Sequence, residues 1–239
     1  MLISFPWLTS IPLLAQQIAV VALWVGIILL IAWWLHSFGK AEPELVRKVV
    51  HIGTGNVILF AWLLNMPAII GITASIVASA VTLLSYIFPI LPGINSVGRR
   101  SFGTFFYAVS IGILVAWFWH LQQPYYAAIG ILIMAWGDGL AALIGKNFGK
   151  HKYKFLSSEK SWEGSLTMFL VTYLVCSLIL LPVQGNLWQT WIVSLIVAIA
   201  ATGLEAISFL GIDNLTVPVG SAAIGYFLWE LITNGSTSL

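Results

Sequence analysis

An apolar run between positions 125 and 144 is interrupted by a single carboxylate, Asp138. It follows YYAAIGILIMAWG and precedes GLAALIG, so two helical turns separate it from the nearest basic residue, Lys146. A charged side chain at the centre of a membrane span costs about 2.5–3.5 kcal/mol, and such residues usually face a polar cavity. The flanking glycines, Gly137 and Gly139, permit close approach of a ligand or of another helix. Asp138 is therefore a candidate functional residue, with a hydrogen bond between packed helices as the alternative.

The charged stretch continues beyond Asp138. Residues 137–164 contain one aspartate, two glutamates and five lysines, almost half of the charged residues in the chain. Glu159, Lys160 and Glu163 lie within about one turn and are predicted to share a helical face. Carboxylate oxygens suit Mg²⁺ and lysines neutralise phosphate, so the stretch indicates a site for a Mg²⁺-nucleotide or another polyphosphate. A basic loop attracted to anionic lipid explains the lysines but not the carboxylates.

Other polar residues stand near the ends of apolar runs. Glu205 precedes Asp213 by eight residues and is either functional or simply interfacial. Asp213 and its neighbour Asn214 also suit a turn or a helix cap. Arg47 and Lys48 precede His51 by about one turn, an arrangement that suits phosphate binding but is equally typical of a topology signal.

Several common catalytic motifs are absent from the sequence. GKNFGKH at 145–151 has too few residues between its glycines, and no serine or threonine after the second lysine, for a P-loop. No strand leads into a G-x-G-x-x-G fingerprint, no Cys/His spacing suits zinc, and no serine lies in a G-x-S-x-G elbow. These absences argue against P-loop, dehydrogenase and protease functions.

The composition indicates that lipid surrounds the elements that position these residues. The chain has 239 residues, of which 60% are hydrophobic and 8% charged, whereas a soluble domain has about 25% charged residues. The formal charge of +2 gives no indication of nucleic-acid binding. We predict an all-α polytopic bundle that forms a single integral membrane domain over residues 1–239. The expected spans are residues 14–35, 49–65, 67–90, 103–120, 124–145, 163–183, 187–209 and 216–233.

Basic residues predict the orientation of these eight spans. They occupy every second loop, at Lys40, Arg47 and Lys48, then at Arg99 and Arg100, and then at the five lysines of 146–160. The intervening loops contain no lysine or arginine. Because basic loops face the cytoplasm, both termini are expected on the opposite side and the polar motifs on the cytoplasmic face.

Four segments in order resemble the polyprenol kinase family. They are RKVVHIGTG at 47–55, WGDGLAALIGKNFGK at 136–150, SSEKSWEGSLTMF at 157–169 and LEAISFLGIDNLTVPV at 204–219. This family includes phytol, farnesol and dolichol kinases and CTP-dependent diacylglycerol kinases, and the chain resembles most the phytol kinases of cyanobacteria and plastids. The resemblance covers roughly residues 47–220, with catalytic motifs at 47–55, 136–164 and 204–219.

The resemblance implies transfer of the γ-phosphoryl group of CTP, or of UTP, to a long-chain isoprenoid alcohol drawn from the bilayer, with Mg²⁺ as cofactor. The residues expected to act in catalysis are Asp138, Lys160 and Glu163, of which the expected Mg²⁺ ligands are Asp138 and Glu163. The residues expected to bind the nucleotide are Gly139, Lys146, Gly149, Lys150, Ser158, Asp213 and Asn214. The expected phosphate or substrate rim consists of Arg47, Lys48, His51 and Glu205.

Two other functions compete with this one. The block from Asp138 to Glu163 also resembles phosphatidate cytidylyltransferases, which bind CTP as well, but the chain has GIDNLTVPV in place of their C-terminal signature. A transporter is the second competitor, because carboxylates within a membrane also mark transport paths. Transport predicts polar residues that reach the far side of the membrane, whereas here they gather on one side.

Overall fold

The computed structural model describes residues 13–39, 41–88, 102–155, 158–208 and 210–235. Within these residues, seven helices are long and apolar enough to cross a membrane. Six of them are α1 (Leu13–Ser37), α4 (Ala68–Ile87), α6 (Gly103–His120), α9 (Trp162–Gln184), α10 (Trp188–Ala206) and α11 (Asp213–Gly235). The seventh is continuous through α7 (Pro124–Leu132), the π segment η2 (Ile133–Asp138) and α8 (Gly139–Phe148). The protein is an all-α integral membrane protein, as the composition predicts.

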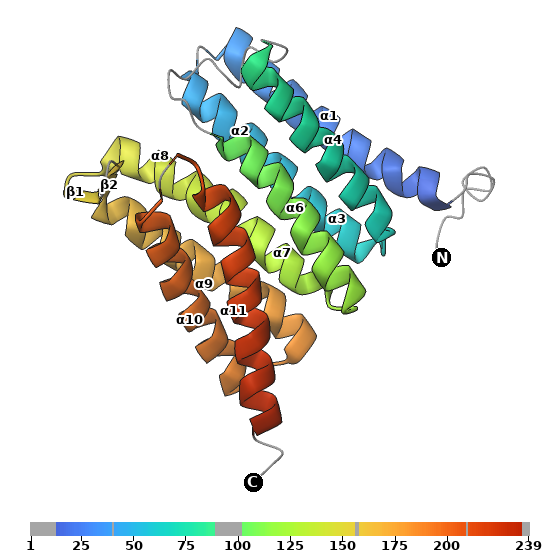
Figure 1. Cartoon of the computed structure of the whole chain (residues 1–239). Helices are drawn as coiled ribbons and strands as arrows, with labels where there is room; N and C mark the ends of the chain where they lie inside the picture. Colours follow the sequence, from blue (N-terminus) through green and yellow to red (C-terminus); the bar gives the residue numbers. More distant parts are fainter. Residues whose placement is uncertain (1–12, 40, 89–101, 156–157, 209, 236–239) are drawn as a thin grey trace, which may run out of the picture.

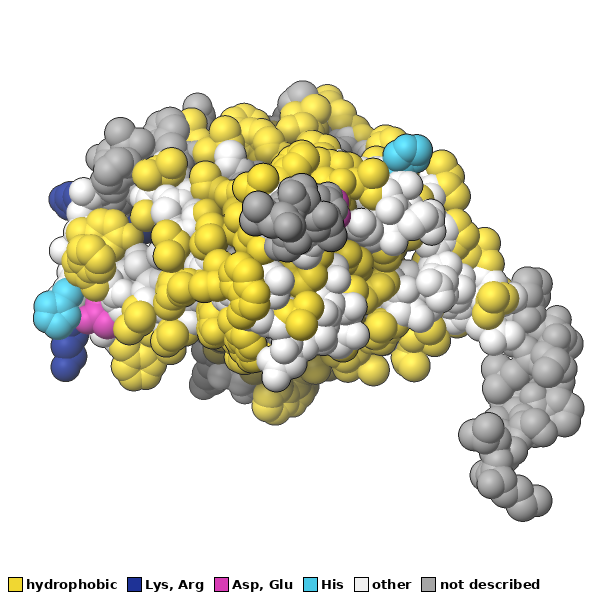
Figure 2. All heavy atoms as spheres, turned by 90° about the horizontal axis from the view of Figure 1, so that it is seen from below, with side chains coloured by type: hydrophobic (Ala, Val, Ile, Leu, Met, Phe, Trp, Pro, Cys, Tyr) yellow, Lys and Arg dark blue, Asp and Glu magenta, His cyan; other side chains and the backbone are white. Residues whose placement is uncertain are grey.

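The α7–η2–α8 helix forms the centre of the bundle. Helices α1, α4 and α6 lie on one side of it, and helices α9, α10 and α11 lie on the other (Figure 1). In its most apolar window 67% of the residues are buried, a larger share than in any other described span. Hydrophobic side chains cover most of the face seen in Figure 2, and the lysine and arginine side chains visible there lie at its edge. Among the described spans, the central helix is therefore the most enclosed by its neighbours, and it carries Asp138.

The predicted second span, 49–65, consists of two short helices, α2 (Pro43–Gly55) and α3 (Val57–Leu63). They meet at Asn56, whose side-chain amide donates to the Ile52 carbonyl at 2.9 Å. Gly53 and Gly55 weaken the helix here, and the Trp24 indole donates to the Gly53 carbonyl at 2.8 Å. Neither helix alone is long enough to cross a membrane, so the number of spans stays a prediction.

The described ends of the chain lie at the same end of the bundle, on different helices (Figure 1). The beginning of α1 and the end of α11 are both at the end of the bundle away from the hairpin of β1 (Lys152–Phe155) and β2 (Ser158–Ser161) (Figure 1). Which side of the membrane this end faces stays a prediction. The basic residues Lys40, Arg99 and Arg100, which support that prediction, lie outside the described residues.

The prediction that Glu159, Lys160 and Glu163 share a helical face is wrong. Strands β1 and β2 pair antiparallel, with Lys154 opposite Glu159 and Tyr153 opposite Lys160. Helix α9 begins only at Trp162, where the Ser161 hydroxyl accepts a hydrogen bond from the Gly164 amide at 3.1 Å. Because side chains alternate along a strand, Glu159 and Lys160 project from opposite faces of the hairpin.

Candidate functional site

The Asp138 carboxylate forms an ion pair with Lys48 inside the bundle. The Lys48 ammonium lies 2.5 Å from Asp138 Oδ2, and the Lys48 side chain is 4% exposed. His51 Nε2 lies 3.9 Å from the same oxygen and 3.3 Å from the Met134 carbonyl oxygen. Lys48, predicted as a rim residue, is thus a buried counter-ion of Asp138.

Close helix packing brings this pair together. Lys48, Ile52 and Gly55 follow one another at intervals of three or four residues along one face of α2. A Cβ atom on Gly55 would lie 2.4 Å from the Ala135 Cβ, and one on Gly139 would lie 2.7 Å from Ile52. A Cβ at position 55 leaves no room for Ala135, and one at position 139 would force the Ile52 side chain to move, so Gly55 and Gly139 keep α2 close to the central helix. Gly139, predicted to contact nucleotide, therefore has a packing role in this structure.

The π segment η2 ends at Asp138. A π segment closes its hydrogen bonds over five residues, is rare, and frequently occurs at functional sites. Here it lies where the central helix contacts both α2 and α9. The sequence carries no periodicity signal for it, because the residues around it are apolar on every side.

A second buried ion pair joins the hairpin to α10. The Lys160 ammonium donates to both the carboxylate and the main-chain carbonyl of Glu205, which is 8% exposed. Glu205 lies near the end of α10, eight residues before Asp213 at the beginning of α11. The three motif segments that the sequence analysis grouped thus meet at one end of the bundle.

Other predicted nucleotide contacts lie at the edge of this cluster. Lys146 pairs with Glu42, and Lys150 is exposed. Gly149 packs against Ser161, and its amide donates to the Gly145 carbonyl. Gly145 and Gly149 thus allow close packing against Ser161 and form the turn at the end of α8. Ser158 begins β2, and nothing is described of its side chain.

Glu163 contacts His151 in this structure, and Asp138 contacts Lys48. The Glu163 carboxylate accepts hydrogen bonds from the ring of His151 at 2.7 Å and from the His151 amide at 3.2 Å. These contacts fix the turn that leads into β1. Among the described residues, no group of three or more His, Cys, Asp or Glu side chains is arranged to hold a metal ion.

The remaining predicted residues serve local structure. Arg47 pairs with Glu44 at 2.6 Å on the surface of α2. The Asn214 amide donates to the carboxylate of Asp213 at 3.1 Å and to the Gly211 carbonyl at 3.2 Å, at the beginning of α11. On the outer face of the hairpin, a hydrogen bond from Lys152 lowers the pKa of Glu159.

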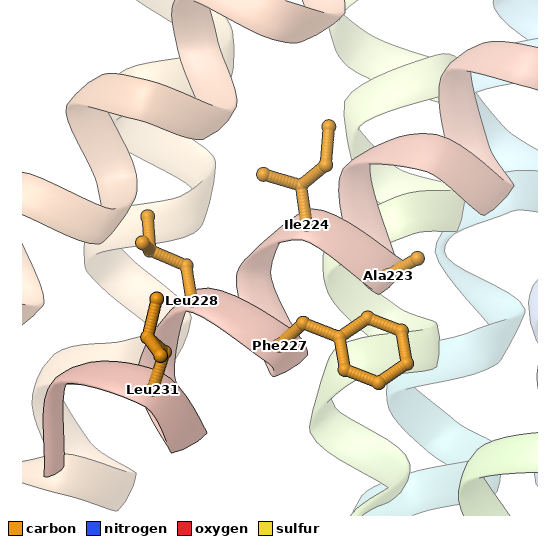
Figure 3. A pocket seen from close by; sticks show the side chains of 5 residues that line it. All are labelled: Ala223, Ile224, Phe227, Leu228 and Leu231. Carbon is orange, nitrogen blue, oxygen red and sulfur yellow. The ribbon is translucent and has the colours of Figure 1, made fainter. Parts of the chain in front are cut away.

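An apolar groove lies elsewhere, along α11. It encloses about 320 Å³ and is lined by Ala223, Ile224, Phe227, Leu228 and Leu231 (Figure 3). Phe227 and Leu231 are more than half exposed, so the groove faces the lipid. It contains no group capable of acid–base or phosphoryl chemistry.

Comparison with known proteins identifies the family. Residues 2–203 match the cytidylyltransferase family. The chain is 48% identical to a phytol kinase of Synechocystis, over 89% of this chain and 92% of the relative. The chain belongs to the cytidylyltransferase family, in its phytol kinase group. It is also 28% identical to phytol kinase 1 of Arabidopsis thaliana, over 77% of this chain and 66% of the relative.

A farnesol kinase of Arabidopsis thaliana is 29% identical to this family member, over 80% of this chain and 67% of the relative. No solved structure matches the chain significantly. The resemblance to the polyprenol kinases that the four segments indicated is confirmed. The sequence analysis missed the burial of Lys48. A lysine next to an apolar run is ordinary at the end of a membrane span, so its burial could not be predicted from the sequence.

Proposed function

We propose that this protein is a kinase of long-chain isoprenoid alcohols. It transfers the γ-phosphoryl group of CTP, or of UTP, to the terminal hydroxyl of an alcohol such as phytol. The observation that carries the proposal is the 48% identity to a phytol kinase over nearly the full length of both chains. The farnesol kinase relative supports an isoprenoid alcohol as the class of acceptor.

The chemistry of the site agrees with this reaction. Phosphoryl transfer depends almost entirely on positioning and on electrostatic stabilisation, which buried cations supply. Lys48 and Lys160 are the two lysines held inside the cluster, each by a carboxylate. In the proposed reaction both ammonium groups turn from their carboxylates to the phosphates of the nucleotide. Asp138, released from Lys48, then accepts the hydrogen bond of the alcohol.

The bonds in this reaction balance without a further reactant. The alcohol oxygen forms a bond to the γ-phosphorus, and the bond between that phosphorus and the oxygen bridging to the β-phosphorus breaks. The hydroxyl proton passes to the Asp138 carboxylate, and CDP leaves. The isoprenoid tail stays in the bilayer, so the hydroxyl reaches the level of Asp138 without the tail entering water.

The carboxylates at this end fit a Mg²⁺ ion that arrives with its nucleotide. Mg²⁺ usually binds one or two protein carboxylates and completes its shell with phosphate oxygens and water. Asp138 and Glu205, which Lys48 and Lys160 hold at this end of the bundle, would be the carboxylates available to such an ion. When bound, the ion neutralises phosphate charge. We assign Glu163 to holding the turn at His151, in place of the predicted second ligand.

A cytidylyltransferase is the second candidate, favoured by the family match over residues 2–203. Such an enzyme attaches the α-phosphorus of CTP to a lipid phosphate and releases pyrophosphate. The two reactions are separated by supplying CTP labelled at the γ- or the α-position with Mg²⁺, and with phytol or phosphatidic acid as the acceptor. We expect labelled lipid only from the γ-position and only with phytol. Label that enters phosphatidic acid from the α-position would replace the kinase by the cytidylyltransferase.

A further inference from the structure

Tyr107 on α6 is a buried tyrosine whose hydroxyl is unsatisfied. The residue is 9% exposed, and its hydroxyl has no hydrogen-bond partner among the residues that the structure describes. That oxygen lies 2.9 Å from the position that a Cβ on Gly55 would occupy. A buried tyrosine hydroxyl usually has a partner, and one without a partner calls for an explanation.

The hydroxyl lies next to the candidate site. The Tyr107 ring packs on the ring of His51 with 4.6 Å between their centroids, and His51 Nε2 lies 3.9 Å from Asp138 Oδ2. Gly55, beside the hydroxyl, also contacts Ala135, which precedes Asp138 by three residues, or about 4.5 Å along the central helix. The hydroxyl is therefore deeper in the bundle than the Lys48–Asp138 pair.

The lipid-facing surface comes close to this position. Trp136 is 37% exposed, whereas its neighbours Ala135 and Gly137 are buried. The Trp136 indole donates to the side-chain oxygen of Asn56 at 3.0 Å, at the junction of α2 and α3. A polar pair thus lies on the lipid-facing outside of the bundle within two residues of Asp138.

We propose that Tyr107 binds the acceptor alcohol and orients its hydroxyl toward Asp138. The Tyr107 hydroxyl donates a hydrogen bond to the oxygen of the alcohol, and the proton of the alcohol points to the Asp138 carboxylate. A lone pair on the alcohol oxygen then remains for the γ-phosphorus. Tyr107 itself gives up no proton. This inference rests on the proposed function and adds the residue that recognises the hydroxyl.

The test compares Tyr107→Phe with wild type and with Tyr173→Phe. Tyr173 is a partly buried tyrosine on α9 that packs on Trp191, so it is a matched control. Initial rates are measured with γ-labelled CTP and phytol at varied mole fraction in detergent micelles. Phytane, the hydrocarbon without the hydroxyl, is added as a competitor, and thermal unfolding is followed for each variant.

We expect Tyr107→Phe to raise the KM for phytol about 5- to 10-fold, as for loss of one hydrogen bond. The KM for CTP and the inhibition constant of phytane stay within twofold of wild type, because the nucleotide and the tail make other contacts. The unfolding temperature does not fall, because the lost hydroxyl has no protein partner. Tyr173→Phe behaves as wild type.

Three results would overturn the inference. They are an unchanged KM for phytol, an equal rise in the KM values for phytol and CTP, and a marked loss of thermal stability. The last would mean that the hydroxyl already has a partner within the protein. If wild type itself transfers no γ-label to an alcohol, the proposed function fails, and this result is seen before any variant is compared.

Discussion

The Lys48–Asp138 pair changes how each residue is understood. Considered alone, Asp138 is a carboxylate whose removal makes membrane insertion easier. With Lys48 beside it and almost fully buried, removal of one charge leaves the other without compensation. Breaking a buried pair in this way costs about 3–5 kcal/mol, whereas replacing both partners by apolar or neutral groups is often neutral.

We therefore predict strong coupling between the two residues. Asp138→Asn and Lys48→Met are each expected to lower the free energy of unfolding by about 3–5 kcal/mol, and the double variant by much less. All three variants lose γ-label transfer. Thermal unfolding in detergent and label transfer are measured on the same preparations. Additive losses of stability in the double variant would show that the pair does not act as a unit.

The hairpin is the element that the sequence predicted least well. Its strands are only four residues long: β1, KYKF, alternates lysine with an aromatic residue, but β2, SEKS, is polar throughout, so the pattern is too short to predict a hairpin. The spacing of Glu159, Lys160 and Glu163 suits a helix equally well. The residue that Lys160 contacts on the inner face of the hairpin, Glu205, comes from a distant part of the chain. The long apolar helices, in contrast, are predictable because membrane thickness sets their length.

Because side chains alternate along the strands of the hairpin, we predict that substitutions of two of its lysines change the KM for CTP by very different amounts. Lys160 reaches the buried Glu205, whereas Lys152 pairs with Glu159 on the outer face and is 63% exposed. Lys160→Met is expected to raise the KM for CTP more than 10-fold, since a phosphate contact is lost. Lys152→Met is expected to leave the KM for CTP within twofold of wild type, because an exposed ion pair such as Lys152–Glu159 contributes little to stability. Equal effects of the two variants on the KM for CTP would contradict this assignment.

The site residues were predictable to different degrees. Asp138 stands out because a charge within an apolar run is rare. The burial of Lys48 depends on Gly55 and Gly139, whose close contacts appear only once α2 lies against the central helix. Tyr107 gave no signal, because an aromatic residue in a membrane span is ordinary. Contacts between spans therefore account for most of what the sequence left open.

At the scale of the whole molecule, the polar cluster lies at one end of a lipid-facing bundle. The hairpin, the beginning of α2 and the beginning of α11 meet there, and the described termini lie at the other end (Figure 1). This arrangement suits an enzyme whose nucleotide comes from water and whose acceptor comes from the bilayer. It also makes the orientation of the bundle testable.

We predict that the hairpin faces the cytoplasm and that both termini face away from it. Ser4→Cys and Lys152→Cys are introduced separately in a Cys176→Ser background. This background removes the native cysteine, which is buried, so that only the introduced thiol can react. A membrane-impermeant thiol reagent applied to intact cells should label position 4 and not position 152. In inside-out vesicles the pattern should reverse. Labelling of both positions from the same side would contradict the eight-span arrangement.

The π segment makes the site sensitive to the length of the chain. Each residue of an α-helix turns the following side chain by about 100°. The wider turn at Ile133–Asp138 fixes the angular phase between the half of the helix that faces α11 and the half that faces α2. A single-codon deletion in the regular helix on either side of this turn would rotate one half against the other by about 100°. Catalysis would then be lost with every residue of the site still present in the gene.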